Sequence, residues 1–360
     1  MKQKALNIYS FTEAGSDLAA GLAAGLSGLG YECRAYTLER FAQRRGLEGL
    51  APDWKETLGK SWGERGLVFI GAAGIAVRAI APYVKDKFSD PAVIVLDEKG
   101  EFVIPLLSGH VGGGVELAGI LQGLTGGTAV VTTATDVRKK FAVDVFAVRN
   151  GLILSDREEA KKISASVLEG KKTGLFSELP IGGTWPEELT ACAGPKELEQ
   201  CSARIMICRR PPEKKERGVL YLFPKNLYVG MGCKRGTEKE ILARELERVL
   251  SDNALLPEQV CAVGSIDLKK DEAGLIGLAK ELGVPFVTFP AEQLEQTEAV
   301  SEPSEFVRQV TGVDNVCERA ARLLCPEGSL LQKKAKLDRC TAAIVCRTPE
   351  LRFDRGGERK

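Results

Sequence analysis

The sequence contains one histidine, His110, and this scarcity limits where imidazole chemistry can take place. Histidine is the side chain whose unperturbed pKa lies closest to neutral pH, so proton transfer by an imidazole has one possible position. Ten cysteines are present, yet no two of them form a Cys-x-x-Cys pair. This pattern argues against a thiolate metal site, and we expect reduced, mostly buried thiols.

Neither sign of charge is in excess, and long hydrophobic runs are absent. Lys and Arg number 50 against 49 Asp and Glu, which gives a net charge of +1. This balance argues against a generally basic protein that binds nucleic acid. No apolar run approaches the length that spans a membrane, and the first residues resemble a strand rather than a signal peptide. We therefore predict a cytoplasmic protein that binds neither nucleic acid nor membrane.

A chain of 360 residues, of which 44% are hydrophobic, is long enough for two or three domains. Apolar runs typical of strands alternate with helical patterns, which predicts the α/β class with helices on both faces of a sheet. We expect a mainly parallel N-terminal α/β domain over residues 1–145. A small middle region and linker over 146–225 and a second, smaller α/β domain over 226–350 follow.

His110 lies in a glycine-rich loop between an apolar run at 103–107 and a helical pattern that begins near Val115. Glycines permit positive φ angles and let the backbone approach a bound molecule closely. A strand, a glycine loop and a helix, with a titratable residue in the loop, form a common α/β active site. The alternative is a tight turn that carries a solvated histidine.

Five segments that follow predicted strands concentrate Gly, Ser, Thr, Asp and Lys: residues 71–78, 108–116, 132–136, 230–237 and 265–274. Open α/β sheets bind ligands beyond their strand ends, where helix N-termini and basic side chains hold anions. Neither glycine loop has the spacing of a nucleotide fingerprint, and each basic residue taken singly has a solvated surface role as its alternative. The predicted substrate-binding residues are Gly74, Arg78, Ser108, Gly112, Gly113, Gly114, Thr132, Thr133, Gly232, Lys234, Arg235, Ser265, Lys269 and Lys270.

The same segments hold the candidates for acid–base chemistry, which are His110, Glu116, Asp136, Asp267 and Glu272. A carboxylate early in a helix also complements the helix dipole, and an aspartate also serves as an N-cap, so Glu116 and Asp136 each have a structural alternative. No Gly-x-Ser-x-Gly motif surrounds Ser108, and a hydrolase with a serine nucleophile is poorly supported.

Several long strings, in matching order over nearly the whole chain, resemble the cobalt-precorrin-5A hydrolase family of anaerobic cobalamin biosynthesis. The N-terminal strings are GAAGIAVRAIAP at 71–82, DPAV at 90–93, IPLLSGH at 104–110 and TTATD at 132–136. Those near the C-terminus are GMGCKRG at 230–236, SIDLKKDEAGL at 265–275, TGV at 311–313 and VCERAA at 316–321. The middle region resembles the family least. The chain also departs from the family at Val115, where relatives usually have asparagine.

The resemblance implies a cytoplasmic hydrolase whose substrate is a ring-contracted tetrapyrrole that carries cobalt and a δ-lactone. Lactone opening would give cobalt-precorrin-5B and release acetaldehyde. We expect no cofactor and no protein-bound metal, because the cobalt belongs to the substrate. Other enzymes of the pathway are the transient partners expected.

The chemistry of the implied reaction assigns roles to the candidate residues. His110 would take a proton from the water that attacks the lactone carbonyl, and Glu116 or Asp136 would orient the imidazole. The backbone amides of Gly112 to Gly114 would stabilise the oxyanion. Two alternatives stay open, namely a non-catalytic carrier of corrinoid intermediates and an unrelated two-domain α/β enzyme that acts on a nucleotide or carboxylated metabolite.

Overall fold

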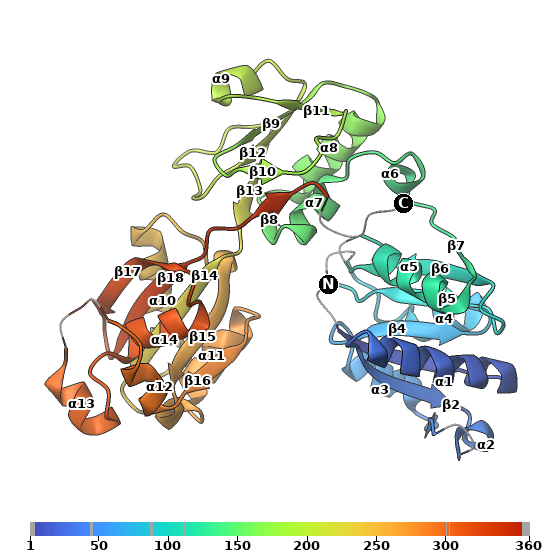
Figure 1. Ribbon diagram of the computed structural model, residues 1–360, viewed down its shortest axis with the longest axis horizontal. Coiled ribbons are helices and arrows are strands. Elements are labelled where there is room, and N and C mark those ends of the chain that lie inside the picture. The colour runs from blue at the N-terminus through green and yellow to red at the C-terminus, as the bar shows by residue number, and fades with distance from the viewer. Residues whose placement is uncertain are drawn as a thin grey trace. The chain divides into compact units, whose positions relative to one another are not determined.

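The computed structural model describes residues 4–43, 46–86, 89–110, 112–299, 301 and 303–354. The chain forms two compact units, residues 1–145 and residues 146–360, which the colours of Figure 1 follow from blue to red. Both units are α/β, so the predicted fold class is confirmed. Within the described part of the chain, no helix is long and apolar enough to cross a membrane. All ten cysteines are free thiols.

The first unit is built on a seven-stranded sheet, sheet A, with the strand order β3-β2-β1-β4-β5-β6-β7. The Thr12 hydroxyl accepts a hydrogen bond from the Gly15 amide (3.0 Å) and so caps the first long helix. The elements are β1 (Ala5–Ser10), α1 (Glu13–Gly28), β2 (Glu32–Thr37), α2 (Glu39–Ala42), β3 (Glu48–Gly49), α3 (Trp54–Lys60), β4 (Gly66–Ile70), α4 (Ala73–Ile80), β5 (Val93–Leu96), β6 (Phe102–Leu107), α5 (Gly114–Thr125), β7 (Thr128–Ala129), α6 (Ala134–Val137) and α7 (Val143–Arg149), which continues into the second unit.

Sheet A is mainly parallel, as predicted, but β6 runs antiparallel to β5, and β7 runs parallel to β6. Residues 97–101 alone connect β5 to β6, and the Asp97 carboxylate accepts hydrogen bonds from the amides of Lys99 (2.9 Å) and Phe102 (2.7 Å). A parallel crossover needs about a dozen residues or more, so this short turn allows only an antiparallel neighbour.

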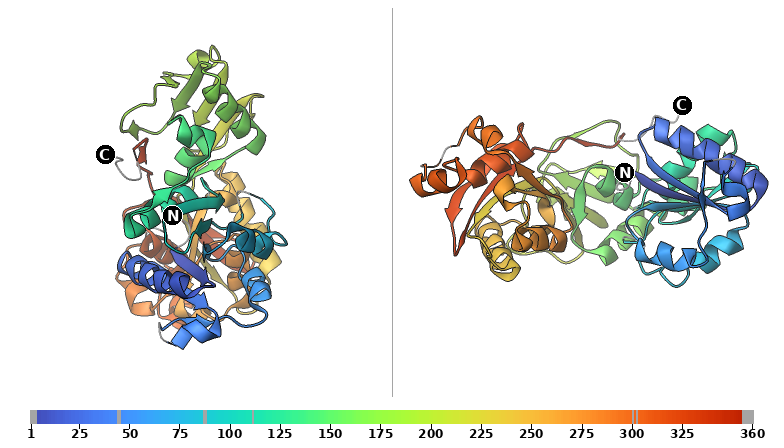
Figure 2. Two further views of the ribbon diagram at one scale, coloured as in Figure 1. Left: turned by 90° about the vertical axis from the view of Figure 1, so that its right-hand side faces the viewer. Right: turned by 90° about the horizontal axis from the view of Figure 1, so that it is seen from below.

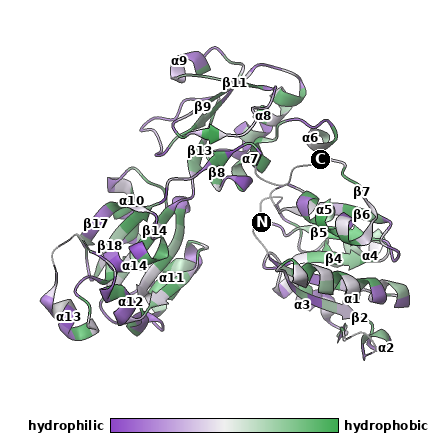
Figure 3. Cartoon of the chain, in the orientation of Figure 1, coloured by the Kyte–Doolittle hydropathy of each residue, from purple (hydrophilic) through white to green (hydrophobic). Residues whose placement is uncertain are grey.

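Helices cover both faces of sheet A (Figure 2). Leu6 and Ile8 of β1 pack with Leu22 and Leu26 of α1 on one face. Phe69 and Val95 pack with residues of α3 and α4 on the other. Successive side chains of a strand point to opposite faces of the sheet, so β1 contributes to both of these cores. In Figure 3 the hydrophobic colour accordingly follows the central strands β4 and β5.

The second unit contains two five-stranded sheets, with orders β11-β9-β12-β13-β8 and β16-β15-β14-β18-β17. Its elements are β8 (Leu152–Leu154), α8 (Arg157–Leu168), β9 (Thr173–Ser177), β10 (Ile181–Gly182), β11 (Leu189–Ala191), α9 (Pro195–Leu198), β12 (Ala203–Ile207), β13 (Val219–Pro224), β14 (Leu227–Cys233), α10 (Lys239–Asp252), β15 (Val260–Ile266), α11 (Ala273–Glu281), β16 (Phe286–Phe289), α12 (Ala291–Glu295), α13 (Glu305–Thr311), α14 (Val316–Leu324), β17 (Ser329–Lys336), β18 (Cys340–Cys346) and β19 (Leu351–Arg352).

The two sheets of this unit occupy consecutive parts of the chain, residues 152–224 and 227–346. In the second sheet β14, β15 and β16 are parallel, while β17 and β18 form an antiparallel hairpin at its edge. The division of the whole chain into domains over 1–145, 146–225 and 226–350 stays a prediction.

The chain returns from the second sheet to the earlier part of the unit through β19. Leu351 and Arg352 pair in parallel with β10, and the Asn150 side-chain amide exchanges hydrogen bonds of 3.0 and 2.8 Å with the Arg352 backbone. The Phe353 ring lies 5.0 Å from Phe146 and 4.9 Å from Trp185, measured between centroids. Residues 351–353 therefore pack against residues that lie up to some 200 positions earlier in the chain.

Candidate active site

The loop that carries His110 lies at the edge of sheet A where the parallel strands begin. Leu107, the last residue of β6, pairs with Val93, the first residue of β5, because the two strands are antiparallel. The loop at 71–78 follows the parallel strand β4 and lies at the opposite edge. The loop at 71–78 and the loop at 108–116 therefore lie at opposite edges of sheet A. The reason is that β6 runs antiparallel to β4 and β5, so the loop that follows β6 lies where the parallel strands begin.

The His110 loop closes on itself through backbone hydrogen bonds. The Gly113 amide donates to the His110 carbonyl (3.1 Å), and the Gly114 amide donates to the Ser108 carbonyl (3.1 Å). Ser108 has a φ of 52° and Gly113 a φ of 80°. The Ser108 hydroxyl is buried and has no hydrogen-bond partner within the described part of the chain. A strained serine with an unsatisfied hydroxyl in such a loop is typical of functional sites.

The imidazole of His110 lies beside the carboxylate of Asp144. His110 Nδ1 is 3.5 Å from Asp144 Oδ1, and the two side chains are only 13% and 11% exposed. Asp144 lies in the first turn of α7. A carboxylate at this position orients an imidazole and stabilises its protonated form. The pair therefore has the arrangement needed for general acid–base catalysis.

Sequence reasoning missed Asp144 and named Glu116 or Asp136 for the orienting role. Glu116 is exposed on α5. The pKa of Tyr31 is raised by burial, and the charge of Glu116 raises it further, so Glu116 acts on the α1 side of the sheet. Asp136 belongs to α6, and its side chain lies outside the described residues. The roles given to these two acids stay predictions, and Asp144 is the carboxylate recorded beside the imidazole.

The predicted loop at 132–136 does adjoin the His110 loop. β7 is parallel to β6, so both strands end at the same edge of sheet A. A Cβ built on Gly109 would lie 3.9 Å from Thr133 Oγ1. Thr132 and Thr133 are exposed, while the Thr135 hydroxyl is buried and unpaired among the described residues. The two threonines are therefore accessible to a ligand that reaches His110.

Gly74 and Arg78 lie on α4 at the opposite edge. Arg78 Nη1 donates to the Gly74 carbonyl (3.0 Å) within the same helix, in an exposed position. The structure thus does not bring these two residues to His110.

In the second unit, the loops after β14 and β15 lie together because these parallel strands end at one edge. Glu272 joins the loops by accepting hydrogen bonds from the Gly236 amide and from Lys269 Nζ, each at 2.8 Å. Burial raises the pKa of Glu272, but these hydrogen bonds outweigh that effect and the net shift is downward. Lys269 and Glu272 therefore form an ion pair that holds the two loops together.

The remaining predicted residues of these loops divide into two groups. The Ser265 hydroxyl is buried and donates to the Met231 carbonyl (2.7 Å), which gives it a structural partner. Gly232 lies within β14. Lys234, Arg235 and Lys270 are exposed and stay candidates for an anionic ligand.

Replacing Gly112 with alanine should distort the His110 loop. The added Cβ would lie 2.5 Å from Ser108 Cβ and 2.8 Å from the Ser108 carbonyl oxygen, so the backbone must shift. We expect kcat/KM to fall about 10–100-fold, since a displacement near 1 Å costs that much at a catalytic group. The control is Gly119→Ala on α5, where nothing lies within 4 Å of the new Cβ. Equal kcat/KM in the two variants would show that the loop tolerates the shift.

The fold and this site define an α/β protein with an imidazole–carboxylate pair in a glycine-rich loop. Three family profiles match successive parts of the chain. They are described as Cobalamin synthesis G N-terminal (residues 56–136), Cobalamin biosynthesis central region (141–224) and Cobalamin synthesis G C-terminus (227–345).

Individual relatives agree with these profiles. The cobalt-precorrin-5A hydrolase of Salmonella typhimurium is 41% identical over 284 residues, which cover 74% of this chain and 77% of the relative. The enzyme of the same name from Priestia megaterium is 35% identical and covers 78% of each chain. A probable cobalt-precorrin-5A hydrolase from Methanocaldococcus jannaschii is 28% identical over 78% of this chain and 85% of its own. The chain belongs to the cobalt-precorrin-5A hydrolase family, as the sequence strings predict.

Proposed function

We propose that this protein opens the δ-lactone of cobalt-precorrin-5A to give cobalt-precorrin-5B and acetaldehyde in anaerobic cobalamin biosynthesis. The observation that carries the proposal is the 41% identity, across 74% of the chain, to a relative named for this substrate. The His110–Asp144 pair supplies an acid–base group suited to the reaction.

His110 acts as the general base in this mechanism. Asp144 orients the ring, and the imidazole takes a proton from water as the water oxygen adds to the lactone carbonyl. The acyl C–O bond then breaks and releases an alkoxide on the extruded carbon. That alkoxide collapses to acetaldehyde as its carbon–carbon bond to the ring breaks, and the electron pair left on the ring carbon takes a proton from the imidazolium. One water is consumed, and His110 returns to its starting state.

The oxyanion formed at the carbonyl needs hydrogen-bond donors. Of the three predicted amides, those of Gly113 and Gly114 already donate to carbonyls of the loop. The Gly112 amide is the remaining candidate of the three. The Ser108 hydroxyl, which is buried and has no partner among the described residues, is a second donor in the same loop.

The proposal assigns the cobalt to the substrate and gives the protein no cofactor or metal of its own. Its partners are the tetrapyrrole and, transiently, other enzymes of the pathway, with no nucleic acid or membrane. A cytoplasmic location accords with ten free cysteines, since thiols stay reduced there.

A second candidate function is a carrier that binds corrinoid intermediates without converting them. Val115 favours this alternative, because the family resemblance implies asparagine here and the chain has no polar amide at this position.

Anaerobic incubation with cobalt-precorrin-5A, with acetaldehyde trapped as its hydrazone, tests the proposal. We expect aldehyde to form in step with the loss of the lactone. Substrate binding without aldehyde would favour the carrier, and Val115→Asn would then be the variant to assay. Absence of both from the folded protein would contradict the proposed function.

A further inference from the structure

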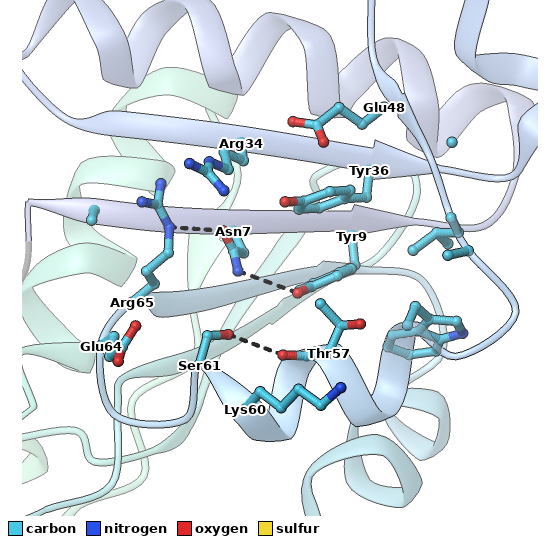
Figure 4. Close-up of a pocket in the computed structure, with 15 residues that line it drawn as sticks. Asn7, Tyr9, Arg34, Tyr36, Glu48, Thr57, Lys60, Ser61, Glu64 and Arg65 are labelled. Carbon is cyan, nitrogen blue, oxygen red and sulfur yellow. Dashed lines mark hydrogen bonds between the residues drawn. The ribbon is translucent and has the colours of Figure 1, made fainter.

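A pocket of about 720 Å³ lies on the face of sheet A that α1 does not cover (Figure 4). Residues of β1, β2 and β3 form its floor, and α3 and the segment that follows it form one wall. Its volume falls in the range of small-molecule sites. None of the residues that line it belongs to the His110 loop.

One end of the pocket is aromatic. Tyr9 and Tyr36 are paired across β1 and β2, so their rings share one face of the sheet, stacked 5.3 Å apart between centroids. Trp54 of α3 lies 5.5 Å from Tyr9. Burial raises the pKa of Tyr9 to about 12, so this hydroxyl stays protonated. Such a surface suits the flat face of a conjugated ligand.

The other end of the pocket is cationic. Asn7 is only 5% exposed, and its side-chain oxygen accepts from Arg65 Nε (2.8 Å). Arg65 also binds the Glu32 carboxylate (2.6 Å), so its charge is already compensated. Arg34 lies at this end, whereas Lys60 belongs to the α3 wall beside Thr57 (Figure 4); both are exposed, and neither has an ion-pair partner within the described part of the chain. These two cations are therefore available to a ligand.

Acidic residues line the pocket as well, one at each end. Glu48 pairs in register with Tyr36 and so belongs to the aromatic end, where it raises the pKa of Tyr9 slightly. Glu64 directly precedes Arg65. A carboxylate on the ligand would thus be attracted to Arg34 and Lys60 and repelled by Glu48 and Glu64.

The cationic end and the His110 loop lie at the same edge of sheet A. Arg65 directly precedes β4, and Ala92 directly precedes β5. A Cβ on Gly112 would lie 3.2 Å from the Ala92 amide nitrogen, so the His110 loop packs against this edge. Arg34 belongs to β2, and the distance from β2 to β6 is four strand spacings, about 19 Å. A ligand that occupies the pocket and also reaches His110 must therefore be broad and flat.

We propose that the pocket binds a carboxylate-bearing edge of the tetrapyrrole substrate. Arg34 and Lys60 bind its carboxylates, and Tyr36 and Trp54 contact its flat face. The identity of the ligand rests on the proposed function, whereas the class of ligand, a planar carboxylate, follows from the pocket itself.

The test compares Arg34→Gln and Lys60→Gln with Lys99→Gln in the full-length protein. Lys99 is an equally charged, exposed residue in the turn between β5 and β6 at the opposite edge of sheet A. Binding is measured by titrating uroporphyrin, a carboxylated tetrapyrrole, and following its absorbance. Activity is measured as acetaldehyde release. We expect each pocket variant to raise Kd and KM about tenfold, the effect of one hydrogen bond to a charged group, with kcat within twofold of wild type.

The outcomes separate this inference from the proposed function. Pocket variants whose Kd and KM stay within twofold of wild type would overturn the pocket and leave the hydrolase intact. Weakened uroporphyrin binding by a protein that releases no aldehyde would support the pocket and contradict the hydrolase. Failure of the wild type to bind uroporphyrin would overturn the pocket. Thermal unfolding of each variant shows that its fold is retained.

Discussion

Replacing His110 with alanine is expected to lower kcat about 10²–10⁴-fold, the usual contribution of a general base, with little change in KM. No other imidazole exists in the chain to replace it. The side chain is largely buried beside Asp144, so we also expect a lower unfolding midpoint, and thermal unfolding establishes that the variant is folded at the assay temperature. Initial rates of acetaldehyde release, measured over a range of substrate concentrations, give both constants.

Chemical rescue provides the control for this variant. The alanine leaves space beside Asp144, and added imidazole should restore part of the lost turnover, whereas the wild type should not respond. Near-normal turnover of a folded His110→Ala variant would remove the histidine from the mechanism and leave the family membership untouched.

Replacing Asp144 with asparagine should lower kcat about 10–100-fold, which is typical when the partner that orients a catalytic group is lost. The amide keeps the size of the side chain but cannot stabilise the imidazolium that forms during the reaction. The matched control is Glu116→Gln, a loss of the same charge from an exposed position on α5. We expect this control to keep at least half of the wild-type kcat.

The comparison of the two carboxylate variants also shows which acid orients His110, Asp144 as in the structure or Glu116 as predicted from the sequence. A large loss in Glu116→Gln with normal kcat in Asp144→Asn would favour the role that the sequence gives to Glu116. The opposite result would assign the orienting role to Asp144. Circular dichroism and thermal unfolding establish that both variants are folded.

The alternation of strands and helices in the first unit could be predicted because its strands are apolar and its helices have caps. The antiparallel direction of β6 was missed, although the sequence contains the signal. Only residues 97–101 separate β5 from β6, and so short a connection cannot return the chain for a parallel strand. This one reversal moved the His110 loop to the opposite edge of sheet A from the loop that holds Arg78.

The site was predictable in part. His110 could be predicted as a site residue because it is the single histidine and lies among glycines. Asp144 could not, because it is 34 positions away in the sequence and belongs to no motif. An acid between Val143 and Val145, in an apolar stretch, was the available signal, because a buried carboxylate needs a partner. The pocket at Arg34 was not predictable, since it depends on the register of β1 with β2 and on how far α3 extends over them.

The strands of residues 152–224 were the least predictable part of the fold. Most are three to six residues long and are interrupted by glycine and proline, so the hydrophobic pattern is weak over any window. β10 additionally pairs with β19, which lies about 170 residues further along the chain, and no local pattern indicates such a partner.

The late position of β19 sets an order of events during synthesis on the ribosome. Phe146 and Trp185 are synthesised early, whereas the ring that packs against both belongs to Phe353 and is synthesised much later. The hydrogen bond between the Asn150 side chain and the Arg352 backbone likewise cannot form until Arg352 has been synthesised. A nascent chain stalled before residue 351 would thus leave the rings of Phe146 and Trp185 without this contact and accessible to chaperones.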